Sequence, residues 1–157
     1  MSRCTKLCSS FFSMDLYSGK TMLKPNTAIH CYLILDQEYS KDYITDQLLQ
    51  LIMSSCAYIH FFGIDSDIWY RAFIRLAKLI YPNDMDCRTE WANVSDSFDD
   101  FINNLHHDLH CRPFVPRDIY LIYDNIDKYH AVLNALYIKD INYKTPEVVN
   151  TKNEKET

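Results

Sequence analysis

Short, continuously apolar runs alternate along this chain with longer segments whose apolar residues recur at helical spacing. The runs have the length of buried strands, and the periodic segments have the length of ordinary helices. Strands are expected at 29–35, 57–62, 87–91 and 119–123. Helices are expected at 41–53, from about 67 to 81, from about 96 to 109 and from about 127 to 136.

Helices that join successive apolar strands imply crossover connections and therefore a mainly parallel sheet. Strands that are apolar throughout indicate that both faces of the sheet are covered. The expected fold is a small three-layer α/β sandwich, with a mainly parallel four-stranded sheet and helices on both faces. Its core is expected to contain Leu33, Leu35, Ile59, Phe61, Trp69, Phe73, Phe101, Ile102, Leu121 and Leu133.

Polar residues mark the points where these helices are expected to begin. Ser40 precedes the first helix, and a run of capping residue types around Asp67 precedes the second. Ser95 or Asp96 is expected to cap the third helix, and Asp127 the fourth.

The chain has 157 residues, which is about the length of one domain. The α/β domain is expected at 28–141. Residues 1–27 are expected to form an N-terminal extension without a convincing secretory signal. Residues 142–157 are polar and end in mixed charges, so they are expected to form a flexible tail.

The chain contains only two glycines, Gly19 and Gly63, and they lie far apart. Walker loops, dinucleotide fingerprints and nucleophile elbows each need glycines at close, fixed spacing. These sites are therefore excluded, and no cofactor is expected.

The net charge of −5 gives no basic field that would hold nucleic acid or an anionic membrane. No apolar run approaches the ~20 residues that span a bilayer. Six cysteines are spread through a chain with ample core material, which favours reduced thiols over a disulfide framework. A cytoplasmic protein that binds neither nucleic acid nor membrane is expected.

Two short elements carry a resemblance. The first is a strand that ends at Gly63, followed by Asp65 and by Trp69 at the start of a helix. The second is Thr89-Glu90-Trp91, followed by the third expected helix. Together they resemble a small bacterial family of unknown function, although residues 92–94 are not acidic as in that family. The resemblance implies a compact α/β domain of bacterial origin and no assigned activity.

Acidic residues follow several of the expected strands. Asp36, Asp65 and Asp124 are the candidate catalytic residues, because the carboxyl ends of parallel strands meet at one edge of a sheet. Carboxylates that converge there could hold Mg²⁺ for phosphoryl transfer. The same residue types also cap helices and make turns, and no phosphate-binding glycine loop accompanies them. The structural explanation is therefore preferred.

His106 and His110 are four residues apart, so they share one face of the third helix at metal-ligand spacing. His107 or Cys111 could add a ligand. Histidines at the carboxyl end of a helix also interact favourably with its dipole. A solvated helix end is preferred, with a Zn²⁺ or Ni²⁺ site as the alternative.

Acidic residues are concentrated in one part of the chain. Residues 84–108 contain seven acidic residues and one basic residue, a net charge of −6, whereas the rest of the chain carries +1. A solvated helix face explains this charge as well as a binding surface does. Next to an exposed tryptophan, however, such a face suits a basic protein partner. The expected partner-binding residues are Glu90, Trp91, Asp96, Asp99 and Asp100.

Three functions follow from these features. The preferred hypothesis is a non-enzymatic bacterial protein-binding module, such as an adaptor, accessory or immunity-type protein, that acts through an acidic, aromatic surface. The alternative is a Mg²⁺-dependent phosphoryl-transfer enzyme or phosphate-ester hydrolase that uses the strand-end aspartates. A self-associating structural subunit, and so a homo-oligomer, is the third.

Overall fold

The computed structural model describes residues 10–16, 28–54, 56–82, 92–110, 117–141 and 145–149. Strands and helices alternate through these residues. The strands are β1 (Ser10–Asp15), β2 (Ala28–Leu35), β3 (Cys56–Gly63), β4 (Ala92–Val94), β5 (Arg117–Tyr123) and β6 (Glu147–Val148). The helices are α1 (Lys41–Met53), α2 (Ser66–Ile80), α3 (Phe98–His110) and α4 (Ile126–Lys139). None of these helices has both the length and the apolar character needed to cross a membrane.

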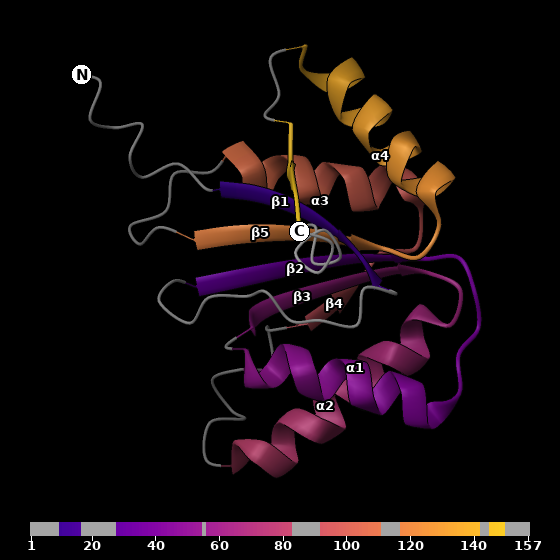
Figure 1. Cartoon of the computed structure of the whole chain (residues 1–157), viewed down its shortest axis with the longest axis vertical. Coiled ribbons are helices and arrows are strands. Elements are labelled where there is room, and N and C mark those ends of the chain that lie inside the picture. The colour runs from indigo at the N-terminus through magenta and orange to yellow at the C-terminus, as the bar shows by residue number, and fades with distance from the viewer. Residues whose placement is uncertain are drawn as a thin grey trace, which may run out of the picture.

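The strands form one parallel sheet in the order β4-β3-β2-β5-β1-β6. Helices α1 and α2 pack on one face of this sheet, and α3 and α4 lie on the other (Figure 1). The expected α/β class, with a parallel sheet flanked by helices, is confirmed. The expected number of strands is wrong, because the sheet contains six strands rather than four.

Both additional strands lie outside the segment 28–141. Strand β1 pairs with β5 along its whole length, and β6 pairs with the other edge of β1. Serines interrupt the apolar pattern of β1, but Ser13 is fully buried and its hydroxyl hydrogen-bonds the Tyr129 hydroxyl at 2.9 Å. Ser13 interrupts the apolar pattern by which the strand would be recognised, but its hydrogen bond allows it to be buried. Strand β6 is too short to produce a periodic pattern.

Successive strand residues point to opposite faces and build two cores. Leu33 and Phe61 pack with Trp69 under α1 and α2, whereas Ile34 and Leu121 pack under α3 and α4. Of the ten predicted core residues, nine are buried; the exception, Leu133, is partly buried against the second core.

The helix starts agree with the predictions in part. Ser40 caps α1, and its hydroxyl accepts a hydrogen bond from the Tyr43 amide. The start of α3 is held by Ser97, which accepts from the Asp100 amide, and not by Ser95 or Asp96. Helix α4 begins at Ile126, and its cap is Asn125 rather than Asp127. The strand predicted at 87–91 lies outside the described residues, and β4 begins immediately after it.

The order of the strands creates a crevice. The connection that follows β2 leads to α1 on one face, whereas the connection that follows the adjacent strand β5 leads to α4 on the opposite face (Figure 1). Ligands of open α/β sheets bind outside the carboxyl ends of strands at such a switch point. This edge is therefore the first place to look for a site.

Candidate functional site

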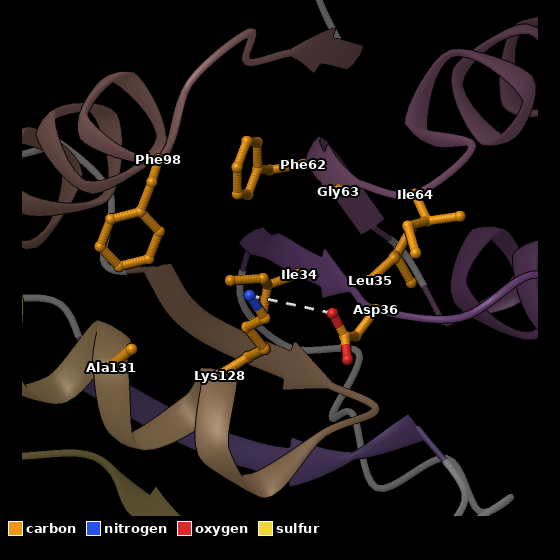
Figure 2. Close-up of a pocket in the computed structure, with 9 residues that line it drawn as sticks. All are labelled: Ile34, Leu35, Asp36, Phe62, Gly63, Ile64, Phe98, Lys128 and Ala131. Carbon is orange, nitrogen blue, oxygen red and sulfur yellow. Dashed lines mark ion pairs between the residues drawn. The ribbon is translucent and has the colours of Figure 1, made fainter.

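A cavity of about 490 Å³ opens at the carboxyl edge of the sheet. The ends of β2 and β3 contribute Ile34, Leu35 and Phe62, and Gly63 and Ile64 continue that wall. Phe98 enters from the start of α3, and Lys128 and Ala131 enter from the first turns of α4 (Figure 2). Its volume lies within the range of small-molecule pockets, and it could equally hold one or two side chains of a partner.

Aromatic rings form one side of the cavity. The ring centroids of Phe62 and Phe98 are 6.2 Å apart, and Phe62 also lies 5.6 Å from Phe101 of the buried core. Phe62 is therefore anchored from behind while it faces the opening. A wall of this kind offers apolar contact area at little conformational cost.

The polar side of the cavity is an ion pair. Lys128 Nζ lies 3.9 Å from Asp36 Oδ1, and the two side chains are 51% and 32% exposed (Figure 2). The side-chain amide of Asn125 donates a 2.9 Å hydrogen bond to the other carboxylate oxygen of Asp36. An exposed pair at this distance stabilises the fold very little, so both charges can re-pair with a ligand.

Asp124 is buried and serves as an acceptor for the turn that follows β2. Its two oxygens lie 2.8 and 3.0 Å from the Asp36 amide, which donates to them, and the Tyr39 hydroxyl donates to Oδ2 at 2.7 Å. Burial raises the pKa of Asp124, although these hydrogen bonds act in the opposite direction. The carboxylate therefore fastens β5 to the turn after β2.

The third candidate acid does not join the other two. Asp65 precedes α2 in a left-handed backbone conformation, with φ of 58°, and its side chain makes no capping hydrogen bond. Among the described residues, Asp36, Asp65 and Asp124 do not form a group of three ligands within metal-binding reach. Sheet topology thus brings Asp36 and Asp124 together and leaves Asp65 separate.

Three of the expected partner-binding acids are close to the cavity residue Phe98 in the sequence. Asp96, Asp99 and Asp100 are exposed and lie within two residues of the cavity residue Phe98. Glu90 and Trp91 lie outside the described residues. Phe62, Phe98 and Lys128 were not predicted as site residues. The signal for them was their position near the end of a strand (Phe62) or in the first turn of a helix (Phe98 and Lys128), because both kinds of position lie at this edge of the sheet.

A buried serine and histidine lie close together under α3. His60 Nε2 is 2.5 Å from Ser95 Oγ, and His60 Nδ1 is 2.8 Å from the Tyr58 hydroxyl. Burial lowers the pKa of His60 to about 4. His60 is fully buried and Ser95 is 3% exposed, so a substrate has no access to this pair. We assign it a structural role.

Asp124→Ala is expected to lower the free energy of unfolding by about 2 kcal/mol, because the Asp36 amide and the Tyr39 hydroxyl both lose their acceptor. Tyr39→Phe removes one of these bonds and should cost about 1 kcal/mol. Urea unfolding of both variants measures the two effects. If Asp124→Ala were as stable as the wild type, the assignment of Asp124 as a fastening residue would be wrong.

No protein-family model matches this chain, and no curated protein matches it either. The resemblance carried by Gly63, Asp65 and Trp69 therefore stays a prediction.

Proposed function

We propose that this protein is a non-enzymatic protein-binding module whose partner docks at the carboxyl edge of the sheet. The observation that carries the proposal is an apolar cavity whose lining residue Phe98 belongs to the segment with the exposed acids: Asp99 follows Phe98 directly in the sequence. Protein interfaces combine an apolar anchor in a pocket with charges around it in the same way.

The cavity defines the anchor. Phe62 and Phe98 form an aromatic wall, and Ile64 leaves 41% of its surface exposed at the same edge. A leucine, methionine or aromatic side chain from a partner would fill this space and remove these groups from water. Burial of one such side chain is worth about 1.5–3 kcal/mol.

The charges define the rest of the partner. Asp96, Asp99 and Asp100 carry no ion pair that the structure describes, and their segment holds the chain's net negative charge. They also complement the amino end of α3, which explains their presence without a partner. A partner segment with lysine or arginine near its apolar anchor would meet them, which accelerates association and sets orientation.

The alternative is Mg²⁺-dependent phosphoryl transfer. The location favours it, because Asp36 lies at the switch point of a parallel sheet. The donor set does not, because both oxygens of Asp124 already accept hydrogen bonds and Asp65 lies apart. The binding module is therefore the better-supported function.

Selection of random peptides on the immobilised protein tests the proposal. We expect the selected sequences to share basic residues next to one large apolar residue. A selected peptide should bind at least about tenfold more weakly to Asp99→Lys with Asp100→Lys, and to Ala131→Trp, which fills the cavity. Fluorescence anisotropy at two salt concentrations measures both effects, and binding should weaken at high salt.

Matched variants control for net charge and for surface changes. Asp42→Lys with Asp46→Lys makes the same charge change on α1, on the other face of the sheet, and should leave binding nearly unchanged. Asn134→Trp adds the same ring at an exposed position of α4 that does not line the cavity. Equal losses in test and control variants would contradict docking at this edge.

Two other results would replace the proposal. Mg²⁺-dependent hydrolysis of p-nitrophenyl phosphate that disappears in Asp36→Asn would establish the enzyme. A molecular mass in solution that rises with protein concentration, and that changes in the Ala131→Trp variant, would establish self-association through this edge.

A further inference from the structure

Three potential metal ligands meet at the end of the molecule that lies opposite the cavity, beyond the amino ends of the strands. His106 and His110 lie in the last turns of α3, and Asp140 follows the last residue of α4. Because α3 and α4 each lead back from the carboxyl edge of a parallel sheet, their carboxyl ends lie on the same side of the molecule (Figure 1). In the described part of the chain, His106, His110 and Asp140 form a group of three side chains that could together bind one metal ion.

The ligand atoms are close enough for one ion. One atom from each residue lies within 4.8 Å of the others, and His110 Nε2 is 3.1 Å from Asp140 Oδ2. The two imidazole rings have centroids 4.2 Å apart. Tetrahedral zinc ligands lie about 3.3 Å from one another, given metal–ligand bonds of about 2.0–2.1 Å. Small rotations of these side chains would therefore complete the site.

Hydrogen bonding fixes which nitrogen of His110 is available. His110 Nδ1 lies 2.9 Å from the backbone carbonyl oxygen of His106, which can only accept, so Nδ1 carries the proton. In the neutral ring, Nε2 then presents a lone pair to the Asp140 carboxylate. Two acceptors at 3.1 Å require a positive charge between them, which is either a second proton on His110 or a metal ion.

His106 distinguishes the two possibilities. Its Nε2 is buried and has no hydrogen-bond partner among the described residues. A proton on His110 would leave this atom unsatisfied, whereas a metal ion would be coordinated by it and by the other two ligands. A buried polar atom without a partner costs about 1–3 kcal/mol in general, so its presence needs an explanation of this kind.

We propose that His106 Nε2, His110 Nε2 and the Asp140 carboxylate bind one divalent transition-metal ion of the Zn²⁺ class, which clamps the ends of α3 and α4 together. Two imidazoles and a carboxylate suit Zn²⁺, with water in the fourth position. The bond from His110 Nδ1 to a carbonyl is the supporting contact typical of a metal-bound histidine.

The surroundings are compatible with the ion. The carboxyl end of α3 contributes a negative dipole end. Burial lowers the pKa of His106, and the charges of His110 and Lys139 act in the same direction, whereas Asp140 acts in the opposite one. His107, on the same turn, is exposed and does not belong to the group.

Calorimetric titration of the reduced, metal-free full chain with ZnCl₂ tests the proposal. We expect one ion per chain and, at 100 times the dissociation constant, a rise in melting temperature of about 5–10 °C. His110→Gln and Asp140→Asn should each weaken binding by at least about tenfold. His107→Gln, the matched control, should bind Zn²⁺ as the wild type does.

The spectrum of the Co²⁺-substituted protein checks the ligands. We expect the visible bands of tetrahedral Co²⁺ without thiolate charge-transfer absorption. No Zn²⁺ binding, or equal affinity in Asp140→Asn, would overturn the proposal in favour of a protonated His110–Asp140 pair. A loss of binding in His107→Gln, or a thiolate band, would overturn the proposed ligand set.

Discussion

Gly63→Ala is expected to lower the free energy of unfolding by about 3 kcal/mol or more. Gly63 ends β3 with φ of 116°, a conformation that residues with a side chain rarely adopt. A Cβ at this position would lie 2.0 Å from the carbonyl oxygen of Leu35. That carbonyl accepts a 2.9 Å hydrogen bond from the Ile64 amide, so β2 would have to move and the bond would break.

Thermal and urea unfolding measure this loss. Ala57→Gly, in the same strand, is the matched control and should cost only about 1 kcal/mol, because that position gains freedom in the unfolded chain without a clash. A Gly63→Ala variant within 1 kcal/mol of the wild type would show that the ends of β2 and β3 do not constrain each other. Because Gly63 lines the cavity, the variant should also bind selected peptides more weakly.

Stability is expected to decrease by about 3 kcal/mol between pH 6.5 and pH 4 because of His60. Burial lowers the pKa of His60 to about 4, although Asp100 and Asp108 act in the opposite direction. The unfolded chain takes up a proton at its ordinary pKa of 6.5, whereas the native ring does not. The unfolded state therefore binds more protons over this range, and unfolding becomes easier as the pH falls.

His60→Gln isolates this effect. The variant should be less stable at pH 7, since Tyr58 and Ser95 lose their imidazole partner, but its stability should depend less on pH. The raised pKa of Asp124 contributes with the opposite sign in both proteins, so it cancels in the comparison. If the variant folds too poorly, an NMR titration of the wild-type imidazole serves instead, and protonation near pH 6.5 would contradict the prediction.

The main strands were predictable because they are apolar without interruption. Strands β2, β3 and β5 are buried on both faces, so each forms a continuous apolar run that can be recognised in the sequence. Strand β1 was not predictable, because it places Ser13 in the interior with a partner, Tyr129, that lies 116 positions away. Local pattern cannot reveal a polar residue that a distant hydroxyl satisfies.

The same distinction applies to the sites. The proximity of Asp36 and Asp124 followed from parallel topology, which brings strand ends to one edge. The candidate metal residues His106 and His110 followed from helical spacing. Asp140 did not, because it lies 30 positions beyond His110 and joins it only through the packing of α3 beside α4. Side chains that come together only through tertiary packing have no characteristic spacing in the sequence.

The position of β1 in the sheet determines when this strand can fold during translation. Ser10 pairs with Asp118, 108 positions later, and the other edge of β1 pairs with β6, which is made later still. At about 5–20 residues per second, a ribosome needs about 5–20 s to produce that first partner. Strand β1 is therefore made long before its partners, and it is among the last of the described strands to enter the sheet. A nascent chain that has not reached Arg117 offers β1 neither of its neighbouring strands, so β1 cannot enter the sheet until β5 has been made.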